Sequence, residues 1–85
     1  MSEIEAVVKE LETLLTKRRW LLERIERREQ KFGISTEKFL KMWRSGELPE
    51  PDDSDLLEDF LSWEADAEEL ESLEKRLKNI VQGSR

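Results

Sequence analysis

The chain has 85 residues, of which 42% are charged and 36% hydrophobic, and its net charge is −6. This length allows one domain at most. The chain contains neither Cys nor His, which excludes disulfides, thiolate nucleophiles, zinc–thiolate sites and histidine general bases. No apolar run exceeds three residues, so we expect no membrane span and no signal-peptide core, and we predict a cytoplasmic protein.

The first predicted element is a long helix over residues of about 3–32. Ser2 and Glu5 have the spacing of a capping box, in which the hydroxyl accepts a hydrogen bond from a free backbone N–H and the Glu reaches back. Apolar residues recur at three positions of each seven-residue repeat, a broad stripe typical of a helix that faces a helical core. Gly33 is expected to end the helix, since glycine adopts the left-handed cap at little cost.

A short helix is predicted next, over residues of about 36–45. Ser35 or Thr36 is expected to cap its N-terminus, and Gly46 to end it. The segment that follows contains two prolines, which exclude both a helix and a central strand. We expect a turn there.

A second long helix is predicted over residues of about 54–81. Asp53, Ser54 or Asp55 is expected to cap it, because acidic and hydroxyl side chains favour the positive end of a helix. The chain is therefore expected to be an all-α helical hairpin of two long helices joined by a short helix, as a single domain over residues 1–85.

Charge is distributed unevenly along the chain. Residues 17–44 carry a net charge of +6, whereas residues 45–74 carry −13. An antiparallel hairpin lays the basic half of the first helix beside the acidic half of the last, so we expect the acids to be partly neutralised by their own chain. Arg18, which interrupts the apolar stripe, is expected to pair with Glu74 or another acid of the seam.

The apolar stripes are wider than a hairpin requires. Each long helix carries apolar residues at three positions per heptad, and two helices alone cannot bury stripes of that width. We therefore expect a homodimer that completes a helical bundle, or a partner protein that covers the remaining apolar surface.

Catalytic chemistry has little support in the sequence. Glu64, Glu68 and Glu71 lie on one helical face, where paired carboxylates can hold Mg²⁺. Some all-helical nucleotide hydrolases use Glu-x-x-Glu pairs in this manner, and Glu26 with Glu29 and Glu68 with Glu71 have that spacing. Such pairs arise by chance in a chain rich in Glu, and no phosphate-binding loop accompanies them. We predict a solvated face, and no catalytic residue, metal or cofactor.

The basic segment 17–31 raises the possibility of nucleic-acid binding. Glu23, Glu26 and Glu29 lie among its arginines at helical spacings of three and four, where they are expected to pair with those arginines. We therefore expect no direct contact with DNA or RNA.

A series of short motifs runs through residues 26–75. It comprises Lys31-Phe32-Gly33 with Ser35 and Phe39, then Gly46-Glu47, then Trp63-Glu64 in an acidic helix. In these motifs the segment resembles the antitoxins of small prokaryotic type II toxin–antitoxin modules. The resemblance implies a protein that wraps a toxin and blocks its active site, with no catalysis of its own. The chain departs from many antitoxins in lacking a recognisable DNA-binding domain.

An acidic amphipathic helix suits a basic, RNA-cleaving partner, because charge complementarity speeds encounter while apolar anchors hold the complex. The predicted partner-binding residues are Trp43, Phe60, Trp63, Glu64, Glu68 and Glu71. Trp63 has an alternative role as a buried core residue, since it lies on the apolar seam. Two alternatives stand for the whole protein: an assembly adaptor that dimerises through its hairpin, and a small Mg²⁺-dependent helical hydrolase.

Overall fold

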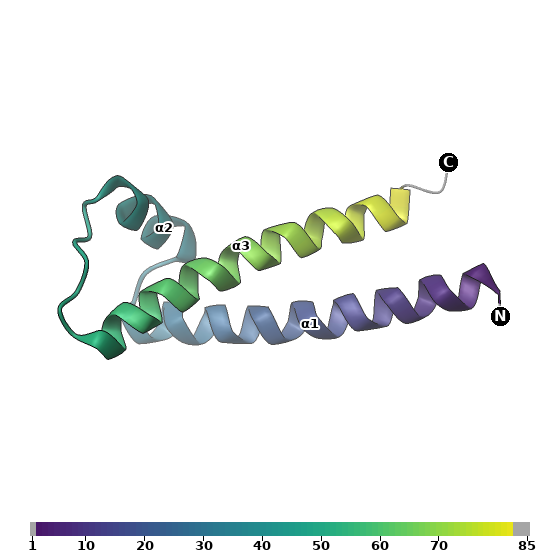
Figure 1. The fold of residues 1–85 in the computed structure, drawn as a ribbon, viewed down its shortest axis with the longest axis horizontal. Coiled ribbons are helices and arrows are strands. Elements are labelled where there is room, and N and C mark those ends of the chain that lie inside the picture. Colours follow the sequence, from purple (N-terminus) through teal and green to yellow (C-terminus); the bar gives the residue numbers. More distant parts are fainter. Residues whose placement is uncertain (1, 83–85) are drawn as a thin grey trace.

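The protein is a helical hairpin closed at one end by a short helix (Figure 1). The computed structural model describes residues 2–82, which form α1 (Glu3–Phe32), α2 (Thr36–Ser45) and α3 (Ser54–Gln82), with no strand among them. The long helices α1 and α3 run antiparallel, and the fold measures 53 × 21 × 19 Å. The predicted all-α hairpin is confirmed. None of the three helices is long and apolar enough to cross a membrane.

The ends of α1 form as its sequence predicts. The Ser2 hydroxyl accepts a hydrogen bond from the Glu5 backbone N–H at 3.2 Å, which is the N-cap bond of the predicted capping box. The Glu5 carboxylate reaches back to Ser2 and accepts a hydrogen bond from its hydroxyl at 3.2 Å. Gly33 ends α1 with a φ of 69°, and Gly46 ends α2 with a φ of 85°. Both angles lie in the left-handed region that favours glycine.

The structure also decides which side chains cap α2 and α3. The Ser35 hydroxyl accepts a hydrogen bond from the Lys38 backbone N–H at 3.1 Å, so Ser35 caps α2. The Asp53 carboxylate accepts hydrogen bonds from the backbone N–H groups of Asp55 and Leu56, at 2.8 and 3.2 Å, and caps α3. Each cap is one of the candidates that the sequence left open.

The core occupies the closed end and the middle of the hairpin. Its buried apolar residues are Leu21, Ile25, Phe39, Phe60, Trp63 and Leu73. No described residue before Leu21 or after Leu73 is buried, and the two long helices diverge toward the termini (Figure 1). Large apolar side chains are therefore exposed at the open end, namely Ile4, Val7, Val8, Leu15 and Val81. The hairpin leaves part of its apolar stripes uncovered, as their width indicates.

Candidate interaction surface

Five aromatic side chains meet at the closed end and join all three helices. This aromatic corner consists of Phe32 on α1, Phe39 and Trp43 on α2, and Phe60 and Trp63 on α3. The Trp63 ring lies parallel to that of Phe39, with 4.0 Å between centroids and 2° between planes. It also stacks with Phe32, at 5.6 Å and 17°. Phe60 also packs against rings of both other helices, so α3 contacts α1 and α2 through Trp63 and Phe60 together.

Polar groups fix the same corner. The Trp63 indole N–H donates to the Thr36 hydroxyl at 2.9 Å, and the hydroxyl and backbone N–H of Thr36 each donate to the Glu29 carboxylate at 2.8 Å. The Trp43 indole N–H donates to the Glu64 carboxylate at 3.2 Å. Both indole donors at the corner are thus satisfied while their rings pack, which sets how α2 sits on the hairpin.

The predicted aromatic anchors lie mainly in this core. Trp63 is 0% exposed and Phe60 is also buried, so neither side chain offers surface to a partner in this conformation. Trp63 occupies the core position that its place on the seam allowed as an alternative. Trp43 is half-buried against the same cluster. These residues therefore stabilise the closed end.

The predicted acidic face is partly engaged within the chain. Arg44, on α2, donates hydrogen bonds to Glu64 at 3.0 Å and to Glu68 at 3.1 Å. The hydrogen bond with Glu64 raises the pKa of the Arg44 guanidinium, so the guanidinium stays protonated. Glu71 pairs with Lys75 one turn further along α3, at 3.6 Å, and both side chains are exposed. The three glutamates thus do not converge on one site.

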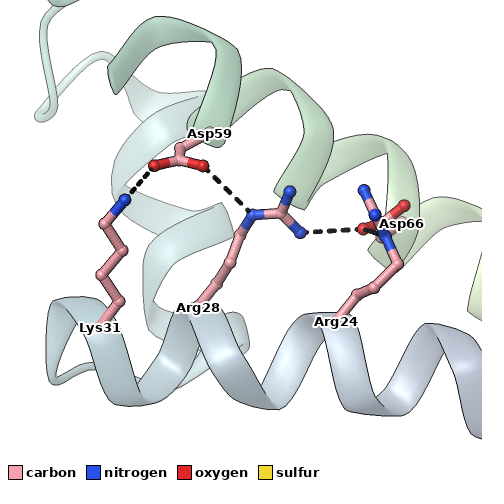
Figure 2. Close-up of polar contacts among 5 residues, drawn as sticks. All are labelled: Arg24, Arg28, Lys31, Asp59 and Asp66. Atoms are coloured by element: carbon pink, nitrogen blue, oxygen red, sulfur yellow. Dashed lines mark hydrogen bonds and ion pairs between the residues drawn. The ribbon is translucent and has the colours of Figure 1, made fainter. Parts of the chain in front are cut away.

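A ladder of ion pairs joins α1 to α3 at mid-hairpin (Figure 2). The buried Asp66 carboxylate accepts hydrogen bonds from Arg24 Nε at 2.8 Å and Arg28 Nη1 at 2.9 Å. Asp59, two turns nearer the corner, accepts one from Lys31 Nζ at 2.6 Å and lies 3.8 Å from Arg28 Nε. The basic half of α1 therefore partly neutralises the acidic half of α3, as the charge map predicts.

The partners of the basic segment differ from the predicted ones. Arg18, Arg24 and Arg28 pair across the hairpin with acids of α3. The ion pairs among residues 2–82 include none with Glu23, Glu26 or Glu29. Glu29 instead accepts hydrogen bonds from Thr36, and Glu26 accepts one from Gln30 at 3.4 Å. The prediction of pairing within α1 is wrong. The arginines extend across the hairpin to carboxylates of α3 instead of turning along α1 toward its own glutamates.

Pairs across the seam extend toward the open end. Arg18 Nε donates to Glu74 Oε2 at 3.1 Å, which confirms the predicted partner of this interruption in the stripe. Lys17 pairs with Glu69 in the same way. Such exposed pairs contribute little stability, but they specify the register and antiparallel direction of α1 and α3.

Not all the acidic charge is used in this way. Residues 46–74 contain thirteen acids, and seven of them form ion pairs within the described chain: Asp59, Glu64, Asp66, Glu68, Glu69, Glu71 and Glu74. The other six have no cation partner among residues 2–82, and all six are exposed: Glu47, Glu50, Asp52, Asp53, Asp55 and Glu58. We call these six the acidic end, since they lie together in the loop before α3 and in its first turns. The charge that the fold leaves over is concentrated there.

Over residues 2–82, no three or more carboxylates are arranged to hold a metal ion. No protein-family model matches the chain, and comparisons with curated proteins and with solved structures find no match. The case for function therefore rests on the surface itself.

Proposed function

We propose that this protein is a non-catalytic, antitoxin-like binding protein that neutralises a basic protein partner on its acidic surface. The observation that carries the proposal is the acidic end, where six exposed carboxylates have no cation partner within residues 2–82. The acids nearer the middle of α3, by contrast, are matched by cations of α1 and α2. Surplus charge of one sign on one part of a surface favours a partner of the opposite sign.

An RNA-cleaving protein is the partner that fits this charge. Such an enzyme carries cations where it holds phosphates, and an acidic surface competes for those cations. Long-range attraction between the two surfaces also speeds their encounter. The resemblance to type II antitoxins agrees with this chemistry, and a gene beside that of the protein would encode the partner.

The test measures association of the full-length protein with the product of the adjacent gene. Glu64 and Glu68 already hold Arg44, so a cleaner change reverses charges outside ion pairs, as in Glu50→Lys with Glu58→Lys. We expect association about tenfold slower and less dependent on salt. The matched control is Glu12→Lys with Glu23→Lys, two exposed acids of α1. An equal association rate for a folded Glu50→Lys/Glu58→Lys protein would exclude the proposal.

A second candidate function is an assembly adaptor that dimerises through its hairpin. The specific observation in its favour is the open end, where Ile4 is 75% exposed and Val81 is 74% exposed. Apolar side chains gathered on one part of a surface favour association. The open end and the acidic end lie at opposite ends of the hairpin, so the two functions are compatible.

A further inference from the structure

A groove with an apolar floor lies between the three helices in the closed half of the hairpin. Its volume is about 530 Å³. The floor is supplied by α1, α2 and α3 together, through Leu22, Ile25, Leu40, Ala67 and Leu70. Ile25 is buried, whereas the other four are only half-buried, so apolar surface remains in contact with water along the groove.

The polar lining of this groove is acidic. Apart from Thr36, it is supplied by five glutamates, namely Glu26, Glu29, Glu37, Glu71 and Glu74. No Lys or Arg lines the groove, although Arg18 and Lys75 reach two of the glutamates from outside it. A second hollow, beside Trp20, differs in this respect, since three cations line it. The groove between the helices is therefore better suited to a basic ligand than the hollow beside Trp20.

The spacing of the lining residues matches a helix. On α1 they are residues 22, 25, 26 and 29, and on α3 they are residues 67, 70, 71 and 74. Both sets follow the i, i+3, i+4, i+7 pattern, so each wall is two helical turns long, about 10 Å. The α1 and α3 sides of the groove, with their apolar residues facing its centre, would accept the apolar face of another helix. Glutamates on both walls would then face cations on both flanks of that helix.

We infer that the groove binds a basic amphipathic helix of the partner protein. This rests on the proposed function and names a second surface, apart from the acidic end, that would contact the partner. A second copy of the chain fits the groove less well. Two copies placed groove to groove would bring ten glutamates together, and each chain already carries a net charge of −6.

The experiment uses the full-length protein and a synthetic helical peptide of Leu and Lys, with Leu at i, i+3, i+4 and i+7. A scrambled peptide of the same composition is the peptide control. Fluorescence anisotropy measures binding to wild type and to Glu26→Gln/Glu37→Gln/Glu71→Gln, which removes rim charge without changing size. We expect the helical peptide to bind wild type and the triple variant to bind it about tenfold more weakly.

The control variant removes the same charge outside the groove and outside the acidic end, at the exposed residues Glu3, Glu12 and Glu23. It should change the peptide's affinity by less than about twofold, since these acids do not face the bound helix. Ala67→Phe, which fills the floor without changing charge, should also weaken binding in a protein whose circular dichroism is unchanged. Equal losses in the groove variant and the control variant, or equal binding of the scrambled peptide, would overturn the inference.

Two further results separate this inference from the proposed function. If the adjacent gene product binds the groove variants normally but Glu50→Lys/Glu58→Lys weakly, the groove is not the site and the proposed function stands. If that product does not bind wild type, the proposed function fails, while the peptide still decides whether the groove takes a basic helix. If the groove variants convert a wild-type dimer into a monomer, the occupant is a second copy and the inference is overturned.

Discussion

Asp66 on α3 faces Arg28 on α1 across the hairpin, with 2.9 Å between Asp66 Oδ2 and Arg28 Nη1, and both side chains are largely removed from water. Arg24 donates to the same carboxylate oxygen at 2.8 Å (Figure 2). A carboxylate in this position compensates two guanidinium groups at once. Removing one member of a buried ion pair costs more than the pair itself contributes, because the remaining charge keeps its desolvation penalty.

Asp66→Ala should therefore lower the free energy of unfolding by about 3 kcal/mol. The measurement is urea denaturation followed by circular dichroism. Glu69→Ala is the matched control, since it breaks an exposed pair with Lys17 between the same two helices and should cost less than about 1 kcal/mol. Equal losses in the two variants would show that Asp66 is no more important than a surface acid.

The position of Asp66 in the sequence indicates a buried acid, but this is hard to notice in a chain with 21 acidic residues. Asp66 lies three residues after Trp63 and four before Leu70, on the apolar face of its helix, where an acid requires a buried cation. Arg24 and Arg28 are four residues apart on α1, so both side chains lie on the face of that helix that contacts Asp66. The charge totals predict that the two helices attract, but they do not indicate which acid is buried, since that depends on the register between α1 and α3.

Trp63 and Trp20 should respond differently to truncation. Trp63→Ala removes a ring that is 0% exposed and stacked on Phe39, and it should cost about 3–5 kcal/mol of unfolding free energy. That is a large fraction of the stability of a small domain, so a lower melting temperature by circular dichroism is expected before any partner is added.

Trp20→Ala is the control for this change. Trp20 is 50% exposed, and the Arg24 guanidinium lies over its ring, 4.8 Å from the centroid. Its truncation should cost about 0.5–1 kcal/mol. A Trp63→Ala protein that melts like Trp20→Ala would contradict the aromatic corner as the core of the closed end.

Gly33→Ala should lower the free energy of unfolding by about 1–2 kcal/mol, because its φ of 69° is one that L-residues with a Cβ adopt at a cost. No atom lies within 4 Å of the position a Cβ would take, so the penalty is conformational rather than steric. Gly33→Asn should recover part of the loss, since Asn tolerates this region. Equal destabilisation by Ala and Asn in thermal melts would count against the conformational explanation.

The helix bounds could be predicted from the sequence, because capping residues mark the helix ends. Ser2, Gly33 and Gly46 act on the nearest turn of backbone and need no tertiary contact to be recognised. The aromatic corner is different, since it brings together Phe39 and Trp63 from segments 24 residues apart. Periodicity placed each ring on an apolar face without showing which rings would meet, so Trp63 was left with both a partner-binding and a core role.

Arg44→Gln should strengthen binding to a basic partner if the proposed function holds. Arg44 is exposed and holds Glu64 and Glu68, so its loss frees two carboxylates on α3. The association rate with the adjacent gene product should rise, while the melting temperature changes little. Arg27→Gln is the control, since Arg27 is exposed and outside the described ion pairs. Equal acceleration in both variants would reflect net charge alone.

The last prediction concerns the open end, where the hairpin leaves apolar side chains uncovered. Light scattering on the full-length protein should give at least about twice the chain mass of 10.2 kDa. Ile4→Glu with Val81→Glu should convert the dimer into a folded monomer, since both side chains are exposed and a second copy is expected to cover them.

Leu61→Glu provides the matched control for self-association. Leu61 is 50% exposed, but it lies near the start of α3, far from the open end. This variant should keep the wild-type mass, because a change in charge there does not touch the surface that the dimer would bury. A wild-type protein that stays monomeric and folded across micromolar concentrations would exclude dimerisation. The exposed stripe would then be left to a different protein, and partner binding should raise the melting temperature of the hairpin.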